Sequence, residues 1–337
     1  MRKPPAGALM VVTAWVLVVP VLLLSVGQRL VAEYRLPAQA RRSPVAAGAL
    51  QSSGRIVRDT RYLVGPAKVG VQAGHWRIDE LPEELARLRS STGARSGQYR
   101  EVDANLDIAT RVVAQLRRAG VNAELLPATV PPGYQADAFV SIHADGAARW
   151  GVRGWKAATP WRASEASRSL LEALSSTYGS FTGLPEDRYG TTYNMRGYYA
   201  FSSHRVRHAI DPTTPAVIIE TGFVTVPEDR EILFGEAETV ALGISAGLMR
   251  FLARRDRFDR AALEVRAYAP LRVITPDALL SFHPREGERP VGRLAAGTLV
   301  RPFHRHDGWV EVMVWGSYRR FGWIREEDLE PHGQGPS

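Results

Sequence analysis

From about residue 63 onward, apolar and polar positions alternate in blocks of two kinds. Short apolar runs at 68–74 (KVGVQAG), 137–142 (DAFVSI) and 215–220 (PAVIIE) have the length and β-branched content of buried strands. Longer segments lie between them and repeat their apolar residues at three- and four-residue steps, which is the helical period. Strands that alternate with helices predict an α/β domain with a mixed or mostly parallel sheet and helices on both faces.

The helical period is clearest in the segment 101–118 (EVDANLDIATRVVAQLRR). Its apolar residues recur at helical spacing, and Gly120 follows as a stop signal. Segments 165–179 and 236–255 repeat the pattern and are predicted to be helices as well. Together with the strands, they indicate one α/β domain over residues 63–255.

The N-terminal 30 residues have a different character. A basic start, MRKPP, precedes an uncharged run from Ala6 to Gly27, which as a helix spans about 33 Å, the thickness of a bilayer core. The run is long for a signal peptide, so a membrane anchor is favoured over a cleaved signal, and either places the remainder in the cell envelope, outside the cytoplasm. Residues 31–62 are rich in Pro, Ser, Gly, Ala and Arg and are interpreted as a linker.

The pattern of apolar and polar residues changes again after residue 260. Short β-type runs are separated by Gly and Pro, and no segment has a helical period of useful length. The turn signal HDG at 306–308 precedes one such run. The segment 264–332 is therefore predicted to be a small all-β barrel.

The amino-acid composition restricts both the partners and the kinds of metal site that the chain can have. The chain carries 43 Lys and Arg against 35 Asp and Glu, a net charge of +8, but the cations are nearly all arginines scattered along the sequence. No nucleic-acid-binding signature accompanies them, so no nucleic-acid partner is expected. There is no cysteine, which excludes disulfides, a cysteine nucleophile and cysteine-based zinc sites. Any metal must be held by histidines and carboxylates.

Titratable side chains stand where three predicted strands end. These are His75, His143 and Glu220, and Glu101 opens the long helix. Each one alone has an ordinary structural explanation, such as a hydrogen-bonded histidine or a carboxylate that complements the helix dipole. Because ligands of open α/β sheets gather beyond the carboxyl ends of the strands, the four are expected to meet. Two imidazoles and one carboxylate form a zinc ligand set with an open position, and the other carboxylate is a candidate proton shuttle.

The residues around these positions carry a family resemblance. The segments Gly74-His75, EVDANLDIA from Glu101, SIHAD around His143 and ETGF from Glu220 agree in order and spacing with a known pattern. Over about residues 66–252, the chain resembles the zinc-dependent N-acetylmuramoyl-L-alanine amidases of the amidase_3 type.

The resemblance implies a function and a role for each residue. It assigns His75, Glu101 and His143 to Zn²⁺ and makes Glu220 the catalytic residue. The substrate it implies is peptidoglycan, cut at the amide bond between N-acetylmuramic acid and L-alanine. Segment 264–332 resembles a bacterial SH3-like module, and such modules often bind wall peptides or glycans.

Departures from the family pattern are local. Gln72 and Ala73 stand where the family usually has Asp-Pro, and the stretch 125–135 is Pro-rich and lacks the family's usual arginine. None removes a candidate ligand. Two other functions stay open at this stage: a zinc peptidase acting on wall peptides, and a non-catalytic envelope-binding protein that keeps the fold. The intact set of four residues argues against the second.

Four other histidines are given less weight. His204 and His208 are four residues apart, a spacing that can chelate a metal from one helix face. His304 and His306 are expected on a solvated hairpin.

Overall fold

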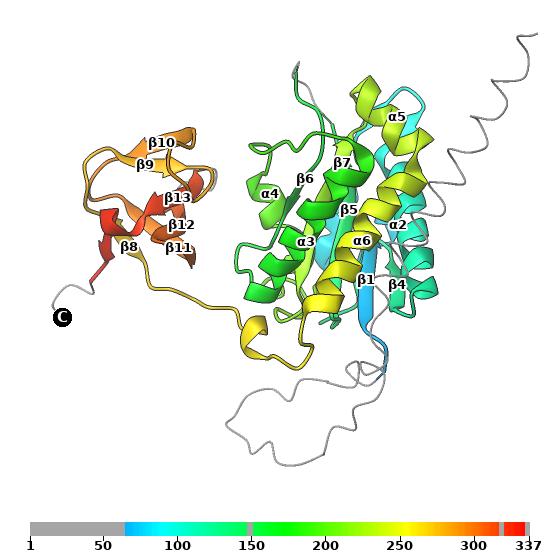
Figure 1. Ribbon diagram of the computed structural model, residues 1–337, viewed down its shortest axis with the longest axis horizontal. Coiled ribbons are helices and arrows are strands. Elements are labelled where there is room, and N and C mark those ends of the chain that lie inside the picture. The colour runs from blue at the N-terminus through cyan, green and yellow to red at the C-terminus, as the bar shows by residue number, and fades with distance from the viewer. Residues whose placement is uncertain (1–64, 147–150, 317–319, 334–337) are drawn as a thin grey trace, which may run out of the picture.

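The computed structural model of the chain describes residues 65–146, 151–316 and 320–333 (Figure 1). The expected membrane anchor or signal peptide at 1–30 and the linker at 31–62 lie outside the described residues. The described part contains an α/β unit followed by an all-β unit.

The α/β unit is built on a five-stranded mixed sheet with the order β4-β1-β5-β7-β6. Its strands are β1 (Lys68–Ala73), β4 (Asn122–Leu126), β5 (Ala138–Asp145), β6 (Lys156–Ala158) and β7 (Ala216–Phe223). All neighbours pair in parallel except β6, which runs antiparallel to β7. The strands predicted from the apolar runs are confirmed, and the central ones are almost wholly buried because they have cover on both sides.

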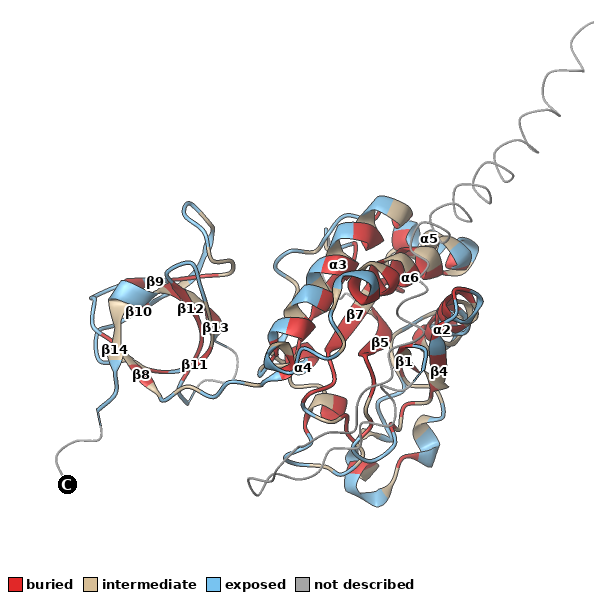
Figure 2. Cartoon of the chain, turned by 60° about the horizontal axis from the view of Figure 1, so that its bottom comes forward, coloured by how far each residue is buried: buried red, intermediate tan, exposed pale blue. Residues whose placement is uncertain are grey.

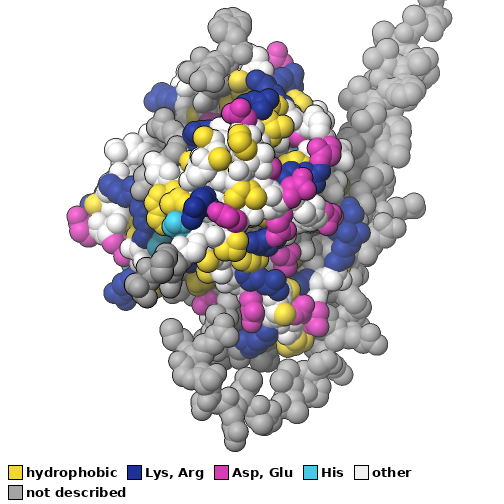
Figure 3. Space-filling model, turned by 90° about the vertical axis from the view of Figure 1, so that its left-hand side faces the viewer, with side chains coloured by type: hydrophobic (Ala, Val, Ile, Leu, Met, Phe, Trp, Pro, Cys, Tyr) yellow, Lys and Arg dark blue, Asp and Glu magenta, His cyan; other side chains and the backbone are white. Residues whose placement is uncertain are grey.

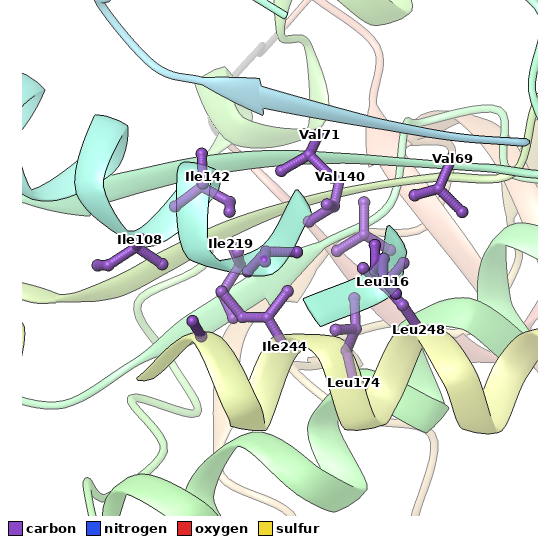
Figure 4. Packing of buried hydrophobic residues seen from close by; sticks show 14 of the residues in the cluster. Val69, Val71, Ile108, Leu116, Val140, Ile142, Leu174, Ile219, Ile244 and Leu248 are labelled. Carbon is purple, nitrogen blue, oxygen red and sulfur yellow. The ribbon is translucent and has the colours of Figure 1, made fainter. Parts of the chain in front are cut away.

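One face of the sheet carries the long helices, which Figure 2 shows as a layer on one side of the strands. They are α2 (Glu101–Arg118), α3 (Glu165–Thr182), α5 (Pro227–Gly235) and α6 (Ala237–Arg254). Figure 4 shows how the apolar side chains of α2, α3 and α6 pack against β1, β5 and β7. Ile108 of α2, Ile244 of α6 and Ile219 of β7 are fully buried in this core. This is the helical stripe that the three- and four-residue spacing predicted.

The opposite face is covered differently. Because side chains alternate along a strand, Phe139 and Ile218 point away from the long helices, and short elements and loops pack on them. The short elements are the 3₁₀ helices η3 (Ile78–Glu80), η4 (Glu83–Leu88) and η5 (Tyr199–Phe201) and the single turn α4 (Tyr193–Arg196). The sheet is thus flanked by helices as expected, but the long ones share one face. Prolines in 127–132 and 212–215 disfavour a helix in these two segments, which help to cover the other face.

No single helix among the described residues is long and apolar enough to cross a membrane. The pair α5 and α6, bent by 80° between them, reaches the required length and composition only when the two are taken together.

The C-terminal unit is a seven-stranded antiparallel sheet with the order β10-β9-β13-β12-β11-β8-β14. Its strands are β8 (Leu271–Val273), β9 (Ala278–Ser281), β10 (Pro290–Leu294), β11 (Leu299–His306), β12 (Trp309–Val314), β13 (Phe321–Arg325) and β14 (Leu329–Pro331). Figure 2 shows the strands curling around a common centre, where Val300, Val312 and Ile324 are buried. The all-β prediction is confirmed. On the side of the molecule seen in Figure 3, Lys and Arg side chains are interspersed with acidic ones.

The β unit docks on the α/β unit next to α4. Glu311 of β12 forms an ion pair with Arg196 of α4, and both residues are only 6% exposed. Arg168 of α3 lies 3.8 Å from the same carboxylate. Beside the ion pair, Trp161 packs on Phe303 of β11 with ring centroids 5.1 Å apart. A buried, charge-paired contact between the units was not apparent from the sequence.

His304 of β11 lies at this contact, so its expected place on a solvated hairpin is wrong. Its side chain is 13% exposed, and its ring meets the edge of Trp323 at a centroid distance of 5.7 Å. His306, two residues further on, points to solvent as expected. The alternation of β11 puts the two histidines on the same face of the strand, and the α/β unit covers only the first.

We expect His304 to make folding stability depend on pH. Burial and the neighbouring Arg168 lower the pKa of His304 to about 4, against the attraction of Glu165 and Glu311. An unfolded histidine titrates near 6.5, so the unfolded chain binds the extra proton between these values and stability falls as the pH falls from about 6.5 to about 4. Denaturant unfolding at both ends of this window should show a smaller loss for His304→Gln than for the wild type or for His306→Gln. Equal losses in all three would contradict the assignment.

Candidate active site

The fold brings the four predicted site residues to one end of the sheet. His75 is the second residue after β1, His143 and Glu220 lie in β5 and β7, and Glu101 is the first residue of α2. Because β5 and β7 are parallel neighbours, His143 and Glu220 are register partners. All four line one cleft of about 760 Å³. The expectation that they meet beyond the strand ends is confirmed.

Three of the four converge on one point. His75 Nε2 lies 3.2 Å from Glu101 Oε1, and His143 Nδ1 lies 3.0 Å from the same oxygen. The three ligand atoms are all within 4.8 Å of one another, and no other group of three or more metal-ligating side chains gathers in this way within 65–146, 151–316 and 320–333. Two imidazole nitrogens and a carboxylate oxygen around one point fit a divalent metal ion.

Glu101 is held as a carboxylate by its surroundings. Its Oε1 accepts hydrogen bonds from Asn105 Nδ2 at 3.1 Å and from the Ala144 amide at 3.2 Å, while its Oε2 accepts one from the Ala94 amide at 2.7 Å. Burial by itself would favour the neutral acid, but the neighbouring imidazoles of His143 and His75 hold the pKa of Glu101 far below its ordinary value. A charged, oriented carboxylate at the start of a helix suits a metal ligand.

The backbone sets the orientation of His75. The residue has a positive φ of 63°, which turns the chain sharply after β1. Its Nδ1 lies 2.5 Å from the carbonyl oxygen of Ser91. A carbonyl can only accept, so Nδ1 carries a hydrogen. In the neutral ring the lone pair is then on Nε2, the nitrogen that faces Glu101 and the metal position. Burial lowers the pKa of His75, but the hydrogen bond and charge of Glu101 outweigh it and raise the pKa on balance.

Gly74 leaves room for the second histidine ring. A Cβ atom on Gly74 would lie 2.4 Å from Cε1 and 2.6 Å from Nδ1 of His143. Real Cβ atoms do not approach other atoms this closely, so any side chain here displaces the ring.

Gly74→Ala is therefore expected to reduce the metal bound per chain at limiting metal concentration while the protein stays folded. The displaced group is the predicted ligand itself, and its Nδ1 must leave the point where it meets Glu101 Oε1. Gly235→Ala at the end of α5 is the control, since its Cβ meets nothing within 4 Å. Metal analysis after gel filtration measures the effect, and full occupancy in Gly74→Ala would contradict this geometry.

Glu220 stands apart from the converging three. Its Oε2 is buried and has no hydrogen-bond partner among the described residues. Burial, together with the charges of Glu101 and Asp145, raises the pKa of Glu220 well above its ordinary value, and Lys156 on the neighbouring strand works in the opposite direction. Lys156 itself is fixed by Asp145 at 2.6 Å. A partly buried carboxyl with a raised pKa in the same cleft is suited to taking up and giving back a proton.

The alternative histidine pair does not join this site. His208 Nδ1 lies 2.6 Å from Glu84 Oε1, in a turn on the loop-covered face, and His204 is in the same turn region rather than on a helix. Sequence reasoning also missed Lys156 and the cleft residue Tyr198. Neither stands in a motif. Strand pairing places Lys156 opposite Glu220, and the packing of the loops brings Tyr198 to the cleft.

Comparison with known families identifies the class. The family model described as N-acetylmuramoyl-L-alanine amidase (Amidase_3) matches residues 69–250, more than half of the chain. The chain therefore belongs to the Amidase_3 family of N-acetylmuramoyl-L-alanine amidases. It is an enzyme that hydrolyses the amide bond between N-acetylmuramic acid and L-alanine in peptidoglycan, and a cell-wall substrate implies action outside the cytoplasm.

Several solved structures of N-acetylmuramoyl-L-alanine amidases are similar to the chain. An N-acetylmuramoyl-L-alanine amidase from Clostridium difficile 630 is 19% identical with a TM-score of 0.40, covering 57% of this chain and 99% of its own. AmiC2 of Nostoc punctiforme is 23% identical with a TM-score of 0.39, covering 56% and 99%. Ami1 of Mycobacterium smegmatis is 19% identical with a TM-score of 0.41, covering 56% and 98%. No curated protein matches the chain. Family membership rests on the match over residues 69–250.

Proposed function

We propose that the amidase is a zinc enzyme in which His75 Nε2, the Glu101 carboxylate and His143 Nδ1 hold the metal and Glu220 is the general base. The observation that carries this proposal is the convergence of the three ligand atoms within 4.8 Å at a cleft that Glu220 also lines. Three protein ligands leave a position open, which is the arrangement of catalytic rather than structural zinc.

The chemistry that zinc supplies when bound is Lewis acidity, which polarises the scissile carbonyl and makes water acidic near neutral pH. The protein supplies orientation and proton transfer. His75 and His143 are neutral ligands with fixed rings, and Glu101 is the charged one. Glu220 takes a proton from the attacking water and delivers it to the nitrogen of the leaving L-alanine, so the carboxylate is restored at the end of the reaction.

The same proposal extends to the rest of the chain. We infer that residues 63–255 form the catalytic domain and residues 264–332 an SH3-like domain that contacts peptidoglycan. Residues 1–30 would tether the enzyme to the membrane or direct its export, with 31–62 as the spacer. The charge-free run from Ala6 to Gly27 supports the N-terminal part, and the curled antiparallel sheet supports the C-terminal part.

Metal analysis of matched variants tests the proposal. The wild-type chain should bind one zinc ion per chain, lose activity to a chelator and regain it with zinc. His143→Ala should lower the zinc content because it removes a ligand. His208→Ala is the control, since that histidine pairs with Glu84 outside the cleft. Wild-type zinc content in His143→Ala, or chelator-resistant activity, would overturn the proposal.

A further inference from the structure

We propose that Gln72 and Tyr198 are positioning residues that fix the tautomer of His143, holding its hydrogen on Nε2 so that the lone pair of Nδ1 faces the metal position. The proposal rests on the zinc site proposed above. It concerns residues that contact neither the metal nor the bond that is cleaved. It follows from counting hydrogen-bond donors and acceptors along one series of buried polar groups.

This series of hydrogen-bonded groups begins at Gln72 in the middle of the sheet. Its side chain is fully buried, and its Nε2 lies 3.2 Å from the carbonyl oxygen of Pro127 and 3.0 Å from that of Ala128. Both carbonyls can only accept, so the amide nitrogen must face them. The amide oxygen of Gln72 is therefore forced to the other side, where it meets two hydroxyls.

Both hydroxyls must donate to that oxygen. Ser141 Oγ lies 2.7 Å from Gln72 Oε1, and Tyr198 Oη lies 3.0 Å from it. An amide oxygen has no hydrogen to give, so the hydrogen of the Tyr198 hydroxyl points at Gln72. The lone pairs of the Tyr198 oxygen are left for a donor on its opposite side.

That donor is His143. Its Nε2 lies 3.4 Å from Tyr198 Oη, and the two rings meet edge to face with centroids 5.4 Å apart and an interplanar angle of 82°. Since Tyr198 has only acceptor capacity left, Nε2 must carry the ring hydrogen. In the neutral imidazole, Nδ1 then has the free lone pair, and Nδ1 is the atom that lies 3.0 Å from Glu101 Oε1. The orientation of the amide thus determines which nitrogen binds the metal.

The two histidines are held in opposite tautomers by the same principle. The Ser91 carbonyl fixes the hydrogen of His75 on Nδ1, and the relay through Tyr198 fixes that of His143 on Nε2. Gln72 stands where members of the Amidase_3 family usually have aspartate. A carboxylate cannot donate to the carbonyls of Pro127 and Ala128, whereas the Gln72 amide can. The amide therefore links the orientation of the His143 ring to the loop after β4.

Tyr198→Phe tests the relay, because it keeps the ring packing and removes only the hydroxyl. Partners that orient a ligating histidine typically contribute tenfold to hundredfold to metal affinity, and we expect a loss of about this size for zinc in a chelator competition. Tyr134→Phe is the matched control. The Tyr134 hydroxyl donates to Glu124 Oε2 at 2.7 Å, outside the cleft, so its removal should leave zinc affinity within about twofold of the wild type.

Nitrogen-15 NMR of the histidines in the zinc-loaded full chain gives a second readout. The wild type should show His143 with a slowly exchanging hydrogen on Nε2 and the metal on Nδ1. In Tyr198→Phe this hydrogen should exchange faster. A wild type that binds no zinc would refute the proposed function. A wild type that binds zinc through Nε2 of His143, or equal affinities in the two tyrosine variants, would refute only the relay.

Discussion

Glu220→Gln is expected to keep its zinc and to lower turnover on muropeptides by about 10²–10⁴-fold, the usual contribution of general acid–base catalysis. Glutamine has nearly the same volume and can still form hydrogen bonds, so the local structure at the end of β7 should be unchanged. It cannot accept a proton at neutral pH. The three ligand atoms at His75, Glu101 and His143 are untouched, which predicts an unchanged metal content.

Glu228→Gln is the matched control for this variant. Glu228 is an exposed residue at the start of α5, eight positions along the chain, and its replacement should change neither rate nor zinc content. Two results for Glu220→Gln would contradict the account. Loss of zinc together with activity would make Glu220 a ligand and reopen Glu101 as the base. A near wild-type rate with zinc bound would remove Glu220 from the mechanism.

Glu311→Ala is expected to cost about 3–5 kcal/mol of stability, because removing one partner of a buried ion pair leaves the other charge buried and uncompensated. The cation left without its partner is Arg196, which donates from Nη2 to Glu311 Oε2 at 3.1 Å. Its guanidinium carbon also lies 4.4 Å from the ring centroid of Trp161. At neutral pH the carboxylate is the relevant form: burial opposes ionisation, but the charge and hydrogen bond of Arg196 lower the pKa of Glu311 on balance.

Denaturant unfolding of the full chain measures this loss. Glu327→Ala is the control, an exposed glutamate of the same β unit, and should fall within about 0.5 kcal/mol of the wild type. Since α4 also lines the catalytic cleft, Glu311→Ala should in addition slow hydrolysis of small soluble muropeptides. Stability unchanged from the control would mean that the contact between the two units contributes little in solution.

The catalytic end of the sheet was predictable because strand-end position is encoded locally. Each apolar run shows where a strand stops, and parallel strands bring their carboxyl ends to the same edge. That logic placed His75, His143 and Glu220 correctly, and the helical period placed Glu101 at the start of α2. Composition helped as well, since the absence of cysteine left only imidazoles and carboxylates as metal ligands.

Other features depend on contacts between segments far apart in the chain and carry no local pattern. Arg196 and Glu311 are 115 positions apart, and neither stands in a motif. Tyr198 meets Gln72 across 126 positions. The cover of the second sheet face is made of loops and single turns, whose course is set by packing rather than by periodicity. The left-handed backbone of His75 follows from the tight turn after β1, where a non-glycine residue is uncommon.

Digestion of purified peptidoglycan by the full chain, with product analysis by mass spectrometry, tests the central claim most directly. The account predicts stem peptides that begin with a free L-alanine amine, together with glycan strands that keep the lactyl carboxyl group. Chelator should abolish their release, and added zinc should restore it. Products cut between amino acids would instead indicate a wall peptidase, and release of the predicted products at full rate in the presence of chelator would contradict the zinc mechanism.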